Sequence, residues 1–361
     1  MFYNSYNTLP GWLAGMPFQH LVTLEQRSKS GPEALTAARL SLEKLAGISE
    51  VMFKQQPGLA VRLKSLETQD PAYLLQEYNH SDWRPVFVSE MIDDMAQVKL
   101  SYLGTATLAD AFESVIKPEV RELLKAQPNV AMREQLRDYA VSQSFRRDLY
   151  IKGKSPMWPQ EYTDEVHRVR MMINPLLPRP SGSDPYRIKG STLDLFGKPE
   201  FYNGILARFQ PGKAATVAEL LAGEPDPNHH DSVVEAVSMM VHGGWLAPCK
   251  ELPNPRGPQI TAVLAELVCQ GAPYRALPLP ALATGHMLPE TDWIMVKHSC
   301  DGVPPAELAA KLLPALTKLG RKFGKEGKPI DDDVEREALI HKLVDEFVSR
   351  TLPFLKSLGA I

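Results

Sequence analysis

The sequence has little of several features that mark common classes of protein. It has only three cysteines, Cys249, Cys269 and Cys300, an odd number spaced too far apart for a CxxC motif. This usage argues against a disulfide-built fold and predicts a reducing, cytoplasmic compartment. No run of about 18 apolar residues is present, so no membrane span is expected. The first residues also lack the basic and apolar pattern of a secretory signal.

The sequence also has no large excess of either positive or negative charge. The 40 Lys and Arg residues nearly balance the 43 Asp and Glu residues, which leaves a formal net charge of −3 at pH 7. Such a balance excludes a general attraction to nucleic acid or to anionic membranes. The apolar fraction of 44% and the charged fraction of 23% are ordinary for globular proteins. A chain of 361 residues is therefore expected to fold into about two or three domains.

The common motifs of catalytic and cofactor sites are missing as well. There is no GxGxxG or GxxxxGK[ST] loop, and the nearest stretch, KLGRKFGKEGK (318–328), is interpreted as a solvated loop, with anion binding as the alternative. No HExxH or H-x3-H spacing exists, so His229, His230 and His242 are interpreted as exposed imidazoles. No GxSxG occurs. The sequence therefore predicts no complete cofactor site, no metal site and no serine nucleophile.

Proline, in contrast, is abundant, with 31 residues against a usual frequency of about 5%. The prolines are dense in two stretches, and they divide the chain because proline interrupts regular structure. The resulting prediction is a mostly α-helical fold with small mixed β (α+β). Its predicted parts are a helical domain (15–152), a Pro-rich connector (153–199) and a C-terminal domain (200–361).

Apolar spacing of three and four residues predicts the helices of the first domain. Asp70 is expected to cap one of them, because Pro71 follows at the first helical position. Short extended segments are expected near residues 86–88 and 100–103. The last helical stretch, 114–151, is expected to bury four residues: Val130, Leu136, Tyr139 and Ala140. The helices predicted before it cover 34–46, 70–80 and 89–98.

The C-terminal domain is predicted to begin with three helices followed by an extended stretch, an order that resembles a winged-helix unit. Its recognition stretch, 228–249, contains no Lys or Arg but does contain Asp231 and Glu235. Because DNA binding needs cations near phosphates, this unit is expected to serve packing and not nucleic acid. A strand is expected within 290–302, followed by helices at 304–319 and 332–357.

The opening of the chain, FYNSYNTLPGW, reads as a strand over 2–7 and a sharp turn at Thr8–Gly11. This segment resembles one found in bacterial class I S-adenosylmethionine-dependent methyltransferases that carry a methyltransferase regulatory domain, including protein-lysine methyltransferases of the rickettsial type. The stretch 71–106 resembles the opening of that regulatory domain, and FRRDLYIK (145–152) resembles its closing segment. The resemblance covers most of the chain and is weak after residue 200.

The resemblance implies that residues 1–14 are the remnant of a Rossmann-like methyltransferase sheet. The family's glycine-rich cofactor loop precedes SYNTxPGW, and this sequence does not contain it. The first strand is therefore expected to be an orphan, and S-adenosylmethionine, the cofactor of the intact family, is expected to have no site in this chain. The resemblance places Tyr6, Asn7 and Trp12 on the substrate side. There Asn7 would hydrogen-bond a substrate amine, and the alternative is a purely structural turn.

The leading functional interpretation is a regulatory, substrate-access and oligomerisation region of a methyltransferase that is not catalytic alone, with protein lysine as the candidate methyl acceptor. The candidate partners are a methyltransferase module that binds S-adenosylmethionine, a second subunit and a protein substrate. Homo-oligomerisation is the corresponding expectation for the assembly. The alternatives are a stand-alone protein-interaction module and a winged-helix nucleic-acid binder, the second being less favoured because of its missing cations.

Overall fold

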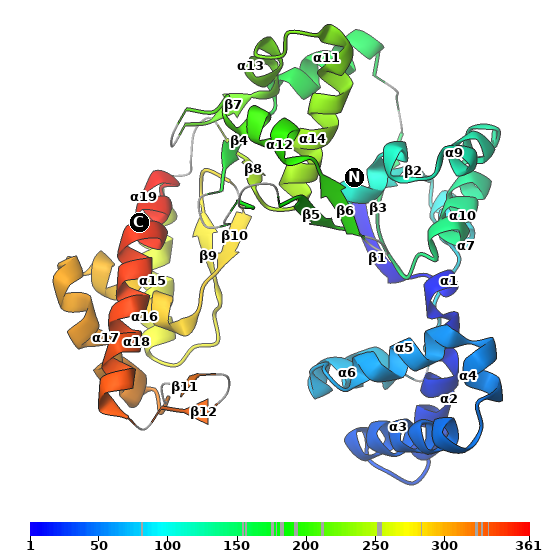
Figure 1. Cartoon of the computed structure of the whole chain (residues 1–361), viewed down its shortest axis with the longest axis horizontal. Helices are drawn as coiled ribbons and strands as arrows, with labels where there is room; N and C mark the ends of the chain where they lie inside the picture. Colours follow the sequence, from blue (N-terminus) through cyan, green and yellow to red (C-terminus); the bar gives the residue numbers. More distant parts are fainter. Residues whose placement is uncertain are drawn as a thin grey trace. The chain divides into compact units, whose positions relative to one another are not determined.

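The computed structural model describes residues 1–80, 82–153, 155, 157–174, 177, 179–180, 184–190, 194–210, 213–250, 255–282, 284–321, 324–325, 328–330 and 332–361. It divides into two compact units, each described by itself below (Figure 1). The first comprises Met1–Pro156 and Lys189–Leu195, and the second comprises Met157–Ile188 and Phe196–Ile361. Residues 322, 323, 326 and 327 of the basic stretch lie outside the described residues.

A helical layer follows the first strand of unit 1. Helix α3 begins with a capping box, in which Ser30 and Glu33 satisfy each other's backbone N–H groups. Asp70 caps α6 as predicted, since its carboxylate accepts from the N–H groups of Ala72 at 2.7 Å and Tyr73 at 3.2 Å. The elements are β1 (Phe2–Asn7), α1 (Leu9–Trp12), η1 (Leu13–Gly15), α2 (Met16–Glu25), α3 (Gly31–Ile48), α4 (Val51–Gln55), α5 (Pro57–Leu66) and α6 (Pro71–Tyr78).

The strand predicted as an orphan has a partner within the chain. Strand β1 pairs antiparallel with β3 (Phe145–Lys152), in a register that sets Phe2 opposite Tyr150 and Asn7 opposite Phe145. The sheet order is β1-β3-β2, with β2 spanning Leu100–Thr105, so β1 lies at one edge. The expectation of an orphan strand is therefore corrected. The helix expected over 114–151 is also corrected at its end, because residues 145–151 belong to the central strand.

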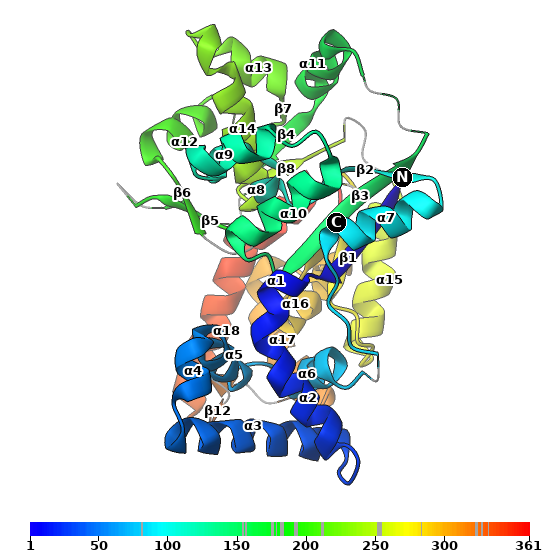
Figure 2. The same cartoon turned by 90° about the vertical axis from the view of Figure 1, so that its right-hand side faces the viewer.

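Helices α7 (Val88–Gln97) and α10 (Val130–Val141) lie alongside this sheet (Figure 2). Two shorter helices, α8 (Leu108–Ala111) and α9 (Pro118–Lys125), complete the group with the 3-10 turn η2 (Glu113–Val115). The predicted burial of α10 is wrong in detail: Val130, Tyr139 and Ala140 are exposed and Leu136 is half-buried. The buried residues of α10 are instead polar, Glu134, Gln135 and Asp138, because they face a buried arginine of β3.

Unit 2 begins with helices around another small sheet, whose strand order is β7-β4-β8. The central strand, β4, comes from the segment predicted as a connector. Helix α14 buries Val233, Val237 and Met240, as its apolar pattern predicts. The elements are α11 (Pro159–Arg168), β4 (Arg170–Ile173), α12 (Pro199–Leu206), β7 (Ala215–Thr216), α13 (Val217–Ala222), η3 (Pro227–His229), α14 (His230–His242) and β8 (Leu246–Pro248). The winged-helix comparison stays a prediction.

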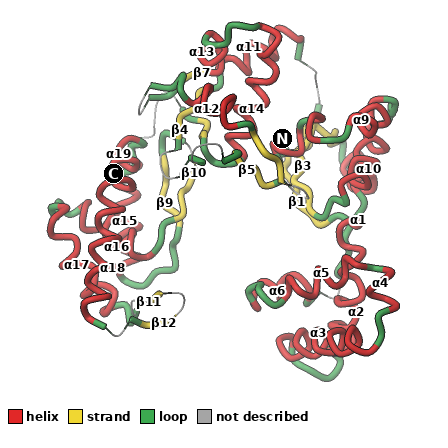
Figure 3. The backbone as a smooth tube through the Cα atoms, viewed as in Figure 1, coloured by secondary structure: helices red, strands yellow, loops and turns green. Residues whose placement is uncertain are grey.

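The rest of unit 2 is largely helical (Figure 3). The strand expected within 290–302 is wrong, because this stretch forms α16 with Trp293, Ile294, Met295 and Val296 all buried. A continuous apolar run cannot by itself distinguish a buried helix from a strand. The elements are α15 (Gly257–Cys269), β9 (Ala276–Leu279), β10 (Thr284–Met287), α16 (Glu290–Cys300), η4 (Pro305–Glu307), α17 (Leu308–Lys318), α18 (Asp333–Glu346), η5 (Phe347–Thr351) and α19 (Leu352–Ser357).

The remaining described strands form two-stranded sheets. Strands of four residues pair in β9 with β10 and in β5 (Tyr186–Lys189) with β6 (Asp194–Gly197), and strands of two residues pair in β11 (Gly324–Lys325) with β12 (Lys328–Pro329). The fold is thus mostly helical with small antiparallel sheets, which confirms the predicted α+β class. No helix among the described residues is long and apolar enough to cross a membrane.

Candidate functional site

The SYNTLPGW segment (residues 5–12) joins β1 to the helical layer. The sharp turn expected at Thr8–Gly11 is corrected, because Leu9–Trp12 form a single turn of helix, α1, and we call residues 8–12 the SYNTLPGW turn. Side chains of this segment bind several parts of unit 1. The Tyr6 hydroxyl donates to Asp148 Oδ2 at 2.6 Å, across to strand β3. Asn7 Nδ2 donates to Glu77 Oε1 of α6. Two of the three predicted site residues are therefore held by different elements, Tyr6 by β3 and Asn7 by α6, and the amide nitrogen of Asn7 is engaged by a carboxylate.

Trp12, the third predicted site residue, lies in the core and is only 5% exposed. Its indole N–H donates to the carbonyl of Ser144 at 2.8 Å. Its ring lies 5.8 Å from that of Tyr78 and 5.7 Å from that of Trp83, and the guanidinium of Arg62 lies 4.1 Å from its centroid. Trp12 therefore packs within the core of unit 1, and among the described residues it shares no hydrogen bond with Tyr6 or Asn7.

The turn itself is held by the backbone of the loop before β3. The N–H of Thr8 donates to the carbonyl of Ser144 at 3.0 Å, and the N–H of Gly11 donates to the carbonyl of Gln143 at 2.8 Å. Thr8 also forms a parallel bridge with Val86. A Cβ on Gly11 would lie 2.4 Å from the Ser144 Cα, so only glycine fits this approach. The turn and the loop before β3 are consequently held together by hydrogen bonds and by close packing.

A buried arginine lies at the centre of the sheet that this turn borders. Arg146 of β3 is 5% exposed and binds three carboxylates. Its guanidinium lies 2.6 Å from Asp138 Oδ1, 2.9 Å from Glu134 Oε2 and 2.9 Å from Asp148 Oδ2. It also donates to the hydroxyl of Tyr102 at 2.8 Å. We call Arg146 with Glu134, Asp138, Asp148 and Tyr102 the Arg146 cluster.

One cation cannot balance three buried carboxylates, and the protonation of the cluster reflects this shortage. Burial raises the pKa of Asp138 to about 6, although Arg146 lowers it. Burial likewise raises the pKa of Asp148, against the opposing effects of Arg146 and of the Tyr6 hydrogen bond. Burial lowers the pKa of Arg146, but Asp138 and the other anions more than reverse this and leave it well above its ordinary value. The phenol of Tyr6 is also held neutral, since burial and then Asp148 raise its pKa.

Reasoning from the sequence missed the Arg146 cluster. The signal that could have found it is the alternation in FRRDLYIK, which sets Arg146, Asp148 and Tyr150 on one face of a strand. A second signal is the pair Glu134 and Asp138, which lie one helical turn apart on α10. Both signals were hidden because polar residues were expected to face solvent.

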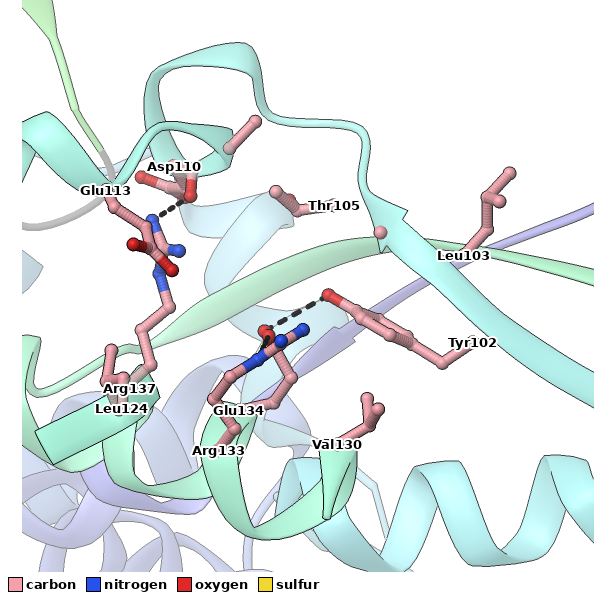
Figure 4. Close-up of a pocket in the computed structure, with 12 residues that line it drawn as sticks. Tyr102, Leu103, Thr105, Asp110, Glu113, Leu124, Val130, Arg133, Glu134 and Arg137 are labelled. Atoms are coloured by element: carbon pink, nitrogen blue, oxygen red, sulfur yellow. Dashed lines mark hydrogen bonds and ion pairs between the residues drawn. The ribbon is translucent and has the colours of Figure 1, made fainter. Parts of the chain in front are cut away.

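A cavity of about 360 Å³ lies next to this cluster, between β2, α8, α9, η2 and α10 (Figure 4). We call it the α10 cavity. Glu134 and Tyr102 contribute to both structures, and the Tyr102 hydroxyl donates to Glu134 Oε2 at 3.1 Å. The remaining lining is a mixture of charged and aliphatic residues: Leu103, Gly104, Thr105, Asp110, Ala111, Glu113, Leu124, Val130, Arg133 and Arg137.

Two larger hollows flank the SYNTLPGW turn. One, of about 880 Å³, is lined by Gly11, Leu13, Val61 and Arg62 among others, and the other, of about 620 Å³, lies beside Leu9 and Trp83. Met16 and Pro17 border both hollows. The turn is therefore a ridge between two open, largely apolar surfaces.

The other candidates from the sequence occupy separate places. His229 contacts Glu224 at 3.3 Å, and within the described part of the chain no three His, Cys, Asp or Glu side chains are grouped to hold a metal ion. Cys249, Cys269 and Cys300 are free thiols and half-buried. Arg321, in the basic stretch, pairs with Glu290 at 3.2 Å.

Comparisons with known proteins place these features in context. Residues 70–152 match a family model described as "Predicted methyltransferase regulatory domain". This range contains the α10 cavity and the Arg146 cluster. It ends with the last residue of β3, the strand to which β1 is paired.

Similar proteins extend the likeness to nearly the whole chain. An uncharacterised protein of Synechocystis, sll1526, is 26% identical over 375 residues, which cover 99% of this chain and 71% of that protein. An uncharacterised protein of Rickettsia prowazekii, RP789, is 23% identical over 49% of this chain and 32% of its own length.

Among solved structures, PKMT2 from Rickettsia typhi in complex with AdoHcy has a TM-score of 0.61 at 16% identity, covering 96% of this chain and 72% of that chain. A second PKMT2 structure has a TM-score of 0.62 and covers 99% of this chain and 73% of that chain. At this identity the PKMT2 likeness establishes a shared fold.

Proposed function

We propose, from the premise that residues 70–152 belong to the methyltransferase regulatory domain family, that this chain is the regulatory and substrate-access region of an S-adenosylmethionine-dependent methyltransferase. The observation that carries the proposal is the connection between the SYNTLPGW turn and that domain. Tyr6 is bonded to Asp148 at 2.6 Å, and Gly11 and Trp12 are held by the loop at 143–144. A shift of β3 or of the loop at 143–144 would therefore be transmitted to the turn.

The likeness to PKMT2 supports S-adenosylmethionine as the methyl donor, because that protein was solved with AdoHcy. Binding the amino-acid end of the cofactor requires backbone N–H groups at a glycine-rich helix start, and binding its ribose requires a carboxylate. The 880 Å³ hollow beside the turn is lined by no carboxylate. This hollow therefore lacks the carboxylate that the ribose requires, which supports the proposal that a separate module holds S-adenosylmethionine.

Titration calorimetry of this chain with S-adenosylmethionine tests the proposal. We expect no saturable heat at cofactor concentrations up to about 1 mM, which corresponds to a binding free energy weaker than about −4 kcal/mol. A Kd in the micromolar range would contradict the proposal and would direct attention to the basic stretch at 318–328.

Within this function, we assign Tyr6, Asn7 and Trp12 to the substrate side of the assembled enzyme. Their roles differ because their environments differ. Asn7 is half-buried, is hydrogen-bonded to Glu77, and is the candidate to accept a hydrogen bond from a substrate amine. Trp12, through its burial, and Tyr6, through its hydrogen bond to Asp148, hold the turn in position.

Asn7→Ala tests this assignment in a protein that combines this chain with the cofactor-binding module. We expect methyl transfer by the folded variant to fall about tenfold or more, as for loss of a hydrogen bond to a charged group. The melting temperature should also fall somewhat, because the hydrogen bond from Asn7 to Glu77 is removed. Asn4→Ala, on the same strand, is the matched control and should retain full activity. Lowered thermal stability with unchanged methyl-transfer kinetics would leave Asn7 a structural residue.

A further inference from the structure

We infer that the α10 cavity binds a free α-amino acid with an aliphatic side chain, recognised as a zwitterion between Arg133 and Glu113. The inference concerns a site inside residues 70–152 and does not rest on the proposed function. It follows from which charged groups of the cavity are already engaged and which remain available.

Most charges of the cavity already have partners. Arg137 donates to the backbone oxygens of Asp110 and, at 3.4 Å, of Phe112, so it braces the cavity wall. Glu134 is engaged by Arg146 at 2.9 Å and by the Tyr102 hydroxyl at 3.1 Å. The carboxylate of Asp110 accepts from Gln143 Nε2 at 3.3 Å. These three groups are held by hydrogen bonds within the protein and have little capacity left for a ligand.

Two charges of opposite sign remain. Arg133 makes one loose contact, from its Nε to Glu134 Oε1 at 3.6 Å, which leaves its terminal nitrogens available. The carboxylate of Glu113 has no ion pair or side-chain hydrogen bond among the described residues. Arg133 reaches the cavity from α10 and Glu113 reaches it from η2, so a cation and an anion from different elements line the same space (Figure 4).

A ligand that complements this pair carries both charges itself. A carboxylate would pair with the planar fork of Arg133, and an ammonium group would pair with Glu113. Leu103, Leu124 and Val130 supply apolar surface for an aliphatic side chain. The volume of about 360 Å³ lies at the small end of the range of about 300–1,000 Å³ for ligand sites, as a free amino acid requires.

The Arg146 cluster gives the cavity a rigid wall. Glu134 is buried, and its position is fixed by hydrogen bonds from β3 and β2, so a ligand would not have to order it. Such preorganisation lowers the entropic cost of binding. A ligand in the cavity would also contact Glu134, which Arg146 of β3 binds. Occupancy of the cavity would therefore affect the strand that holds the SYNTLPGW turn.

The test is titration calorimetry of the full chain with L-leucine and with its two one-charge analogues, 4-methylpentanoate and isoamylamine. We expect L-leucine to bind and each analogue to bind about tenfold or more weakly, because each leaves one charged group of the cavity without its partner. Arg133→Gln and Glu113→Gln should each reduce L-leucine affinity by a similar factor. Arg27→Gln, in the turn after α2, and Glu119→Gln, on α9, make the same charge changes at exposed positions and should leave affinity unchanged.

Several outcomes would overturn the inference. No binding of L-leucine at millimolar concentration excludes the site, and equal binding of isoamylamine or 4-methylpentanoate excludes zwitterion recognition. Affinity that is unchanged in Arg133→Gln and Glu113→Gln places the ligand elsewhere. Circular dichroism of each variant, matching that of the parent chain, ensures that a loss of binding does not reflect unfolding. Failure of these tests would leave the methyltransferase proposal untouched, since that proposal is tested by cofactor titration.

Discussion

At the scale of single residues, Gly11 shows how closely the SYNTLPGW turn approaches the loop before β3. A Cβ at this position would meet three atoms of Gln143 and Ser144 at 2.4–2.7 Å. Two of these atoms belong to the backbone and cannot rotate away. The glycine is therefore required by packing, beyond the turn geometry that its sequence context predicts.

Gly11→Ala is expected to lower the free energy of unfolding by about 1–3 kcal/mol, since the loop must move to accommodate the methyl group. Chemical denaturation monitored by circular dichroism measures this change. Gly47→Ala is the matched control: a Cβ there meets nothing within 4 Å, and alanine favours the interior of α3. We expect that control to be unchanged or slightly stabilised. Equal stability of the two variants would show that the close approach is absent in solution.

At the scale of elements, the interface between α10 and β3 is unusual because its centre is ionic. Asp138 and Glu134 of the helix meet Arg146 of the strand, where apolar side chains would ordinarily pack. Breaking such a buried network is costly, whereas forming it contributes little net stability. Its charge shortage, three carboxylates to one arginine, makes the interface sensitive to pH.

The direction of that sensitivity follows from Asp138, whose pKa burial raises to about 6. Because the folded-state pKa exceeds the unfolded value of about 3.9, the folded state binds the proton more tightly. The stabilising contribution is complete below about pH 4 and is lost as the pH rises through about 6, with a size on the order of 1–3 kcal/mol.

Asp138→Asn should remove much of this dependence, because asparagine has no proton to lose. Melting temperatures measured from pH 4 to pH 7 test it, with Asp93→Asn, at an exposed position of α7, as the control. The parent chain and Asp93→Asn should lose stability together over this range, and Asp138→Asn should lose less. Parallel curves for all three proteins would assign the titration to another group.

At the scale of the whole molecule, the charges of unit 2 bear on whether the chain binds DNA. Helix α14 lies in the stretch predicted to be the recognition helix of a winged-helix unit, and it carries no Lys or Arg. Its residues Val233, Val237 and Met240 are buried, so the apolar face of the helix packs inside its own unit. Asp231 and Glu235 would repel phosphate, and Lys213 and Lys250 are the nearest cations in sequence.

We therefore expect no binding of duplex DNA stronger than the non-specific range of about 10⁻⁴–10⁻⁶ M. A fluorescence-anisotropy titration with random duplex at low salt measures it. Asp231→Lys combined with Glu235→Lys is a useful comparison, since added cations should raise the affinity if the helix is accessible. Submicromolar binding by the parent chain that weakens steeply with salt would restore the nucleic-acid alternative.

The sequence by itself determined what depends on neighbouring residues. The Asp70 cap and Pro71 determine where α6 starts, and apolar spacing predicts α3 and α14, because helical hydrogen bonds and caps close within a few positions. The resemblance of 71–106 and 145–152 to a regulatory domain was likewise readable, and the family match over 70–152 confirms it.

The tertiary structure alone decided what depends on distant partners. The first strand could not reveal its neighbour, because the register that pairs Phe2 with Tyr150 joins residues far apart in the chain. The polar face of α10 looked exposed because a buried carboxylate is favourable only beside a cation, and Arg146 reaches it from β3. Local patterns specify elements, but burial and charge pairing are properties of contacts that only folding creates.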